Sequence, residues 1–169
     1  PSLVSYVQNE DPAAHTVAEL VVKHPAVAAV GFTGSVQGGT AIDALCRSRR
    51  RPIPSFCEMG SVNPVVITTR ALSKRGVHVA DAIAESILAR HGQQCTRPGV
   101  LIAVGKCGEF TERLRDRIAA APARDMLATW VRDGYLRRVQ ECASVEGVRI
   151  TAGNPLPVGG RGAAPVLLE

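Results

Sequence analysis

The stretch AVAAVGFTGSVQGG, residues 26–39, contains the pattern that decides the fold. Its first part, residues 26–32, is a continuous apolar run, as expected of a strand that is covered on both faces. Glycines then allow a tight turn, and Ser35 stands where the N-cap of a helix is expected. Apolar residues follow at helical spacing, so residues 35–47 are expected to form a helix. A strand, a glycine turn and a helix in this order predict an α/β unit.

The same alternation of strands and helices continues along the chain, which predicts an α/β fold with mainly parallel pairing. Apolar runs predict further strands over residues 3–7, 53–58, 64–69, 100–104, 148–151 and 165–169. Apolar residues at helical spacing predict helices over residues 14–24 and 76–90, around Phe110–Ile118 and around Val131–Val139. A Gly/Pro-rich loop is expected over residues 152–165. A domain boundary is expected after the strand that ends near Glu58. This boundary divides the chain into domains of residues 1–60 and 61–169.

Composition limits the possible classes of protein. The chain has 169 residues, of which 46% are hydrophobic, 21% charged and only 4% aromatic, so aliphatic side chains must fill the core. No apolar run approaches the roughly 20 residues of a membrane helix, and no signal peptide opens the chain. The net charge is +5, but the basic run Arg47–Arg51 has no interleaved aromatic side chains. A solvated helix end is therefore favoured over nucleic-acid binding, and no membrane partner is expected.

The cysteines indicate neither a disulfide framework nor a zinc site. Their number is odd, no CxxC motif occurs, and the histidines lie in different segments without ligand spacing. We therefore expect no metal, and a reducing, cytoplasmic location is the natural interpretation. The five cysteines are Cys46, Cys57, Cys95, Cys107 and Cys142.

The motif GFTGSVQGG, residues 31–39, is a candidate phosphate site. Backbone N–H groups and the helix dipole at such a helix start attract anions, and glycines allow close approach. It matches neither GxGxxG nor a P-loop, because no GK[ST] follows. The alternative is a capped helix after a tight turn, with Ser35 as the N-cap.

The motif CEMGSVNP, residues 57–64, places Glu58 at the end of a strand and before a glycine turn. A carboxylate in this position can face a cleft and act as a general base. The alternative is a glutamate that pairs with one of the many arginines.

The motif GQQCTRPG, residues 92–99, places Cys95 in a polar loop between a helix and a strand. A catalytic thiol needs polar access and nearby donors for an oxyanion, which Gln94, Thr96 and the backbone could partly supply. The alternative is an ordinary buried cysteine. The other cysteines fall in or beside apolar patterns and are expected to be structural. Arg97 is a possible carboxylate partner, although arginines in loops are usually solvated.

Together, GFTGS, EMGSVNP and GQQCTRPG resemble, in this order, the motifs of the aldehyde dehydrogenase superfamily. The motif variant EMGSVNP and the stretch HPAVAAVGFTGSVQGG are similar to the sequences of the branch that acts on 2-oxoglutarate semialdehyde. The resemblance implies the end of a Rossmann-like nucleotide-binding sheet, followed by part of the α/β catalytic domain. It also implies oxidation of an aldehyde to a carboxylic acid with NAD or NADP.

The resemblance assigns roles to individual residues. Cys95 is implied to be the nucleophile that forms a thiohemiacetal and, after hydride transfer, a thioester, which water activated by Glu58 then hydrolyses. Residues implied to contact the cofactor are Thr33, Gly34 and Ser35 near the pyrophosphate, and Met59 and Gly60 at the nicotinamide. Family members are usually homo-oligomers, and the expected small-molecule partner is an aldehyde.

The chain departs from the family pattern, most seriously in its oxyanion hole. The family carries a Trp-Asn motif whose Asn completes the oxyanion hole, whereas the only tryptophan here is Trp130, in ATWVRD. We therefore expect the chain to be a truncated portion without dehydrogenase turnover of its own. A non-catalytic remnant or partner-binding module is the alternative. A CoA-acylating relative is a third possibility, disfavoured because Glu58 would serve hydrolysis.

Overall fold

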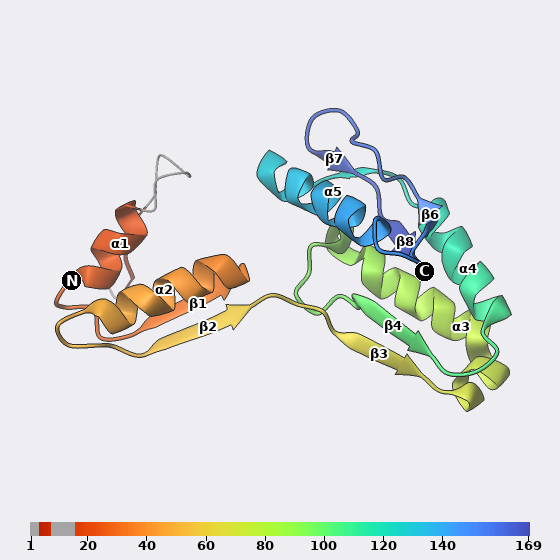
Figure 1. The fold of residues 1–169 in the computed structure, drawn as a ribbon, viewed down its shortest axis with the longest axis horizontal. Helices are drawn as coiled ribbons and strands as arrows, with labels where there is room; N and C mark the ends of the chain where they lie inside the picture. Colours follow the sequence, from red (N-terminus) through yellow and green to blue (C-terminus); the bar gives the residue numbers. More distant parts are fainter. Residues whose placement is uncertain (1–3, 8–15) are drawn as a thin grey trace. The chain divides into compact units, whose positions relative to one another are not determined.

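The computed structural model describes residues 4–7 and 16–169, and it divides the chain into two compact units, Pro1–Gly60 and Ser61–Glu169. Each unit is built separately from strands with helices packed on them (Figure 1). The assignment of these units to a dinucleotide-binding and a catalytic domain stays a prediction. Within the described ranges no helix is long and apolar enough to cross a membrane.

The first unit is a β–α–β arrangement preceded by a helix. A parallel pair of strands is joined by a helix, which is the connection that parallel strands require. The helix between them begins at an N-cap, Ser35, whose Oγ accepts a hydrogen bond from the Gly38 N–H at 3.0 Å. The elements are α1 (Thr16–Lys23), β1 (Val30–Gly34), α2 (Val36–Ser48) and β2 (Ser55–Met59).

Arg49, which belongs to the basic run, connects the end of α2 to the end of α1. Its guanidinium donates to the carbonyl oxygens of Val22, Val27 and His24 at 2.9, 2.8 and 3.2 Å. Carbonyl groups at the end of a helix have no partner within the helix, so a cation is favourable there. Arg49 is therefore a structural residue of the first unit.

The second unit is built around the parallel pair β3–β4 and the helices α3 and α4. Its core consists of the inward side chains of the strands and the facing sides of both helices, including Ile67, Ala80, Phe110, Leu114 and Ile118. The bounds of its first elements are β3 (Pro64–Ile67), α3 (Thr69–Leu88), the short 3₁₀ helix η1 (Ala89–Gly92), β4 (Val100–Ala103) and α4 (Gly108–Ala119).

Two short antiparallel pairs complete the second unit. β5 (Arg124–Asp125) pairs with β7 (Gly162–Ala163), and β6 (Ile150–Gly153) pairs with β8 (Val166–Leu168). Helix α5 (Thr129–Ala143) lies between β5 and β6 in the chain and packs near β7 and β8 (Figure 1).

The α/β class and most elements agree with the sequence prediction, but there are four differences. Residues 4–7 are not a strand, and Leu3 lies outside the described residues, as do residues 14 and 15 of the first expected helix. Helix α3 begins at Thr69 rather than near residue 76, because Thr68 caps an additional turn before a kink at Arg75.

The third difference is in pairing, which is parallel in β1–β2 and β3–β4 but antiparallel in both C-terminal pairs. Two-residue strands such as β5 and β7 are too short to produce a periodic pattern. β7 lies within the loop expected over residues 152–165, and β5 lies where no element was expected. The fourth difference is the burial of β1, which was expected to be covered on both faces. Val30 and Phe32 are half-buried, but Gly31 and Thr33 are exposed. This strand is therefore covered on one face in the first unit.

Candidate active site

The first unit brings six of the expected site residues together at the carboxyl end of its two strands. The parallel register sets Thr33 opposite Glu58 and Gly34 opposite Met59. The Gly60 N–H also donates to the Gly34 carbonyl at 3.2 Å. Thr33, Gly34, Ser35, Glu58, Met59 and Gly60 thus lie at one edge, and the carboxyl edge of parallel strands is where α/β sheets bind ligands.

Glu58 is exposed at this edge, and no ion pair of its carboxylate occurs in the described part of the chain. The arginine partner considered as the alternative for Glu58 is thus not found among the described residues. An exposed, unpaired carboxylate can take a proton from water.

The turn from β1 into α2 presents backbone N–H groups to solvent. Ser35 and Val36 are exposed, and the Ser35 side chain satisfies only the Gly38 N–H. The first amides of an α-helix have no partner within the helix and carry the positive end of its dipole. This arrangement suits an anionic group such as a pyrophosphate.

Glycine is needed at Gly39 for packing rather than for an unusual backbone. A Cβ built there would collide with the Met59 side chain, so the absence of a side chain lets α2 and the end of β2 approach closely. Gly60 has a φ of 67°, in the left-handed region that favours glycine. The chain therefore turns sharply directly after Glu58 and Met59.

Cys95 belongs to the second unit and lies in the loop between η1 and β4. Its side chain is exposed, and it is a free thiol. Access of this kind is what a nucleophilic cysteine requires, and the alternative of a buried loop cysteine is wrong.

The other cysteines fall into three settings. Cys46 is fully buried in α2, and burial raises the pKa of its thiol, which makes it a poor nucleophile. Cys57 and Cys107 are half-buried. Cys142 is exposed in α5, so the expectation of an apolar setting is wrong there, because its position on the helix turns it away from the core.

The backbone before Cys95 is locally strained. Arg90, His91 and Gly92 all have positive φ values, of 49°, 57° and 72°. Only glycine adopts this region freely, so the two side-chain-bearing residues cost about 1–2 kcal/mol each. The sharp reversal directs the chain from the end of α3 into the Cys95 loop.

Ser61 and Asn63 hold the Cys95 loop from the other side. The Asn63 Nδ2 donates to the Cys95 and Arg97 carbonyl oxygens at 2.6 and 2.9 Å, and the Ser61 Oγ also donates to Cys95 O. Sequence reasoning missed both residues; their only signal was a polar pair within the same EMGSVNP motif as Glu58. The Gln94 backbone carbonyl accepts the Arg97 N–H, and the assisting role expected for the Gln94 side chain stays a prediction.

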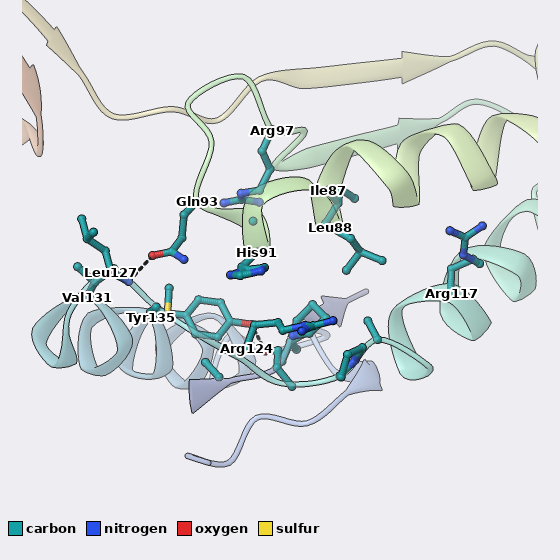
Figure 2. Close-up of a pocket in the computed structure, with 18 of the residues that line it drawn as sticks. Ile87, Leu88, His91, Gln93, Arg97, Arg117, Arg124, Leu127, Val131 and Tyr135 are labelled. Atoms are coloured by element: carbon teal, nitrogen blue, oxygen red, sulfur yellow. Dashed lines mark hydrogen bonds between the residues drawn. The ribbon is translucent and has the colours of Figure 1, made fainter. Parts of the chain in front are cut away.

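A cavity of about 760 Å³ opens beside the Cys95 loop within the second unit. Apolar side chains of α3 and α5, including Leu88 and Val131, line it together with Tyr135 (Figure 2). The Tyr135 hydroxyl donates to the Ala164 carbonyl at 2.9 Å, and burial raises the pKa of this phenol. Cys95 is not among the lining residues.

Arginine side chains also border this cavity, namely Arg97, Arg117 and Arg124, together with the imidazole of His91 (Figure 2). Arg97 is half-buried rather than solvated, and its Nη1 donates to the Pro98 carbonyl at 3.2 Å. Arg117 is paired with Asp81 at 2.7 Å. The cavity wall next to the Cys95 loop therefore carries positive charge.

The Aldehyde dehydrogenase family model matches residues 2–163. The chain belongs to the aldehyde dehydrogenase family. Among curated relatives, Alpha-ketoglutaric semialdehyde dehydrogenase 2 of Azospirillum brasilense is 40% identical over 131 residues, which cover 76% of this chain and 25% of the relative. Alpha-ketoglutaric semialdehyde dehydrogenase of Acinetobacter baylyi is 35% identical over 139 residues, or 81% of this chain and 26% of the relative.

Solved structures of the aldehyde dehydrogenase family share the fold of the chain. A 1-pyrroline-5-carboxylate dehydrogenase from Thermus with bound NAD superimposes with a TM-score of 0.75 at 19% identity, over 90% of this chain and 31% of that one. An NAD-dependent benzaldehyde dehydrogenase from Corynebacterium glutamicum gives a TM-score of 0.76 at 20% identity, over 92% and 35%. The chain thus spans about a quarter of the length of the curated relatives it matches.

Proposed function

We propose that this chain is the part of an NAD(P)-dependent semialdehyde dehydrogenase that carries its nucleophile and its water-activating base. The observation that carries the proposal is the exposed thiol of Cys95 in a loop whose backbone is clamped by Asn63. Similarity to two alpha-ketoglutaric semialdehyde dehydrogenases supports 2-oxoglutarate semialdehyde as the substrate. The cellular setting proposed is the cytoplasm, and the protein is proposed to form homo-oligomers.

In this proposal the Cys95 thiolate attacks the aldehyde carbon, and a sulfur–carbon bond forms as the carbonyl becomes a thiohemiacetal. A bound nicotinamide cofactor supplies the acceptor for the hydride that leaves this carbon. Glu58 then takes a proton from water, whose oxygen attacks the resulting thioester. The carbon–sulfur bond breaks, the carboxylic acid departs, and the Cys95 thiolate is restored.

The residues of the first unit fit the cofactor that this reaction needs. The exposed N–H groups at the start of α2, beside Gly34 and Ser35, suit the pyrophosphate that NAD and NADP share. Met59 and Gly60 lie at the same strand edge and would border the nicotinamide. Hydrolysis is favoured over transfer to CoA because Glu58 is an exposed and unpaired carboxylate at this edge.

The experiment that tests the proposal is protection of thiols by the aldehyde. The chain is incubated with 2-oxoglutarate semialdehyde and then labelled with iodoacetamide, and labelling rates are read at each cysteine by mass spectrometry. A reversible thiohemiacetal at Cys95 should slow its labelling, while Cys142, which is also exposed, serves as the internal control. Butanal, which lacks a carboxylate, should protect less well.

Two outcomes would contradict the proposal. Equal labelling of Cys95 with and without the semialdehyde would remove Cys95 as the nucleophile. Equal protection by butanal and the semialdehyde would remove 2-oxoglutarate semialdehyde as the preferred substrate.

A further inference from the structure

Asn63 has a backbone conformation that few residues adopt. Its φ is 46°, and asparagine is among the few non-glycine residues that are enriched in this region. It lies directly before β3, at the point where the chain enters the second unit. The conformation is stabilised by the hydrogen bonds of its own side chain.

The Asn63 amide group faces acceptors only. Its Nδ2 lies 2.6 Å from Cys95 O, 2.9 Å from Arg97 O and 2.6 Å from Ser61 Oγ. Carbonyl oxygens can only accept, so the nitrogen rather than the oxygen of the amide must face the loop. An aspartate of the same shape could not make these contacts, because both of its oxygens are acceptors when ionised.

A second set of contacts fixes the same loop from neighbouring backbone. The Ser61 hydroxyl donates to Cys95 O, and the Gly99 N–H donates to the Val62 carbonyl at 2.8 Å. A Cβ at Gly99 would lie only 2.5 Å from that carbonyl oxygen, so glycine is required for this close approach. Residues 61–63 thus bind both ends of the loop 95–99.

We propose that Asn63, assisted by Ser61, is a positioning residue that fixes the backbone of the Cys95 nucleophile; this role rests on the proposed function of Cys95. Holding the carbonyls of Cys95 and Arg97 sets the backbone torsions between them, and with them the direction of the Cys95 side chain. A reacting atom displaced by about 1 Å can cost roughly 10²-fold in rate. Neither residue touches the reacting atoms, so their effect acts through Cys95.

The test compares Asn63→Asp and Asn63→Gly with the unchanged chain by amide hydrogen exchange. Asn63→Asp keeps the size but loses the donor, and Asn63→Gly suits the positive φ but lacks the amide. Both should speed exchange at the Arg97 and Gly99 amides roughly 5–30-fold, as expected for the loss of about two hydrogen bonds. Asn154→Asp is the matched control, because Asn154 acts through its Oδ1, an acceptor that aspartate retains.

A readout on the thiol distinguishes positioning from general stability. In both Asn63 variants the iodoacetamide rate at Cys95 should move toward its rate in the urea-unfolded chain, while the rate at Cys142 stays constant. Unchanged exchange at Arg97 and Gly99 would overturn the role of Asn63. Exchange that rises equally throughout α3 and α4 would overturn it too, since the whole unit would then have loosened. Failure of the semialdehyde to protect Cys95 would remove the proposed function, while the exchange result would still decide whether Asn63 holds the loop.

Discussion

The side chain of Gln93 accepts a hydrogen bond from the backbone N–H of Leu127 at 2.7 Å, and Figure 2 shows this bond at one side of the cavity. Gln93 belongs to the loop that carries Cys95, whereas Leu127 precedes α5. The bond therefore ties the loop of the proposed nucleophile to a segment far along the chain. On its other side the same loop is held by Asn63.

The Gln93 side chain makes two hydrogen bonds, since its Nε2 also donates to the Asp125 carbonyl at 3.5 Å. We predict that Gln93→Ala lowers the free energy of unfolding of the second unit by about 1–3 kcal/mol, at about 0.5–1.5 kcal/mol for each hydrogen bond. Gln93→Glu should lose less stability than Gln93→Ala, because a carboxylate still accepts from the Leu127 N–H although it cannot donate to the Asp125 carbonyl. Urea unfolding monitored by circular dichroism measures both variants. Equal losses in the two variants would show that the accepted hydrogen bond is not the source of the effect.

The strained backbone at His91 leads to a second prediction. His91 has a φ of 57°, so His91→Gly should be more stable than His91→Ala by about 1 kcal/mol. His78, in the helical stretch of α3, provides the control, since there the glycine variant should be less stable than the alanine variant by about 1 kcal/mol. Thermal unfolding of the four variants tests this opposite order. The same order at both positions would mean that His91 is not in the left-handed region.

The ion pairs of Asp81, on α3, should make the stability of the second unit depend on pH in the acid range. Arg113 donates to its carboxylate at 2.9 and 3.2 Å and Arg117 at 2.7 Å, and the hydrogen bond from Arg113 contributes most to holding the pKa of Asp81 below its ordinary value. A carboxyl group whose pKa is lower in the folded state stabilises the fold fully above the ordinary aspartate pKa of about 4. That contribution is lost as the pH falls below this value toward the folded-state pKa.

Stability measured against pH tests this role of Asp81. Asp81→Asn should lower stability at neutral pH and should reduce the loss of stability on acidification below about pH 4. Asp116→Asn, on α4, is the matched control, because Asp116 has no ion pair within residues 4–7 and 16–169. If the stability of Asp81→Asn falls on acidification as steeply as that of the unchanged chain, Asp81 is not the source of the pH dependence.

Glu58→Gln should slow hydrolysis of an acylated Cys95 while leaving acylation unchanged. The activated ester p-nitrophenyl acetate acylates a thiolate and releases p-nitrophenolate without any cofactor, so a burst reports acylation and the following phase reports hydrolysis. Glutamine cannot take a proton from water, and loss of a general base typically costs about 10²–10⁴-fold. Glu146→Gln is the control. If Glu58→Gln abolished the burst of p-nitrophenolate but left the rate of the following hydrolysis phase unchanged, the role of Glu58 would be contradicted.

The sequence was sufficient to predict the α/β class and the positions of the motifs, because long apolar runs and glycine turns are local signals. It predicted α2 to within a residue, since Ser35 is a recognisable N-cap. It could not predict β5 and β7, because two-residue strands exist only through pairing between distant segments. The exposure of Cys142 was missed for a related reason, since the packed side of α5 depends on its neighbours.

The candidate site and the contacts that hold it could be derived from the sequence only in part. Glu58 and Cys95 stood out because their residue types carry chemistry in a suitable local setting. Ser61, Asn63 and Gln93 act by hydrogen bonds to backbone groups about 30 residues away in the chain, and no local pattern indicates such contacts. Their roles became visible only when the fold brought the segments together.

The most direct test of the account is to locate the acyl group after reaction of the chain with one equivalent of p-nitrophenyl acetate. The acid-quenched protein is digested, and the acetylated peptide is identified by mass spectrometry. The account predicts the acetyl group on the Cys95 sulfur, and its absence from Cys95→Ser under the same conditions. An acetyl group found on Cys142 or on a lysine, with the Cys95 thiol unmodified, would contradict the assignment of Cys95 as the nucleophile.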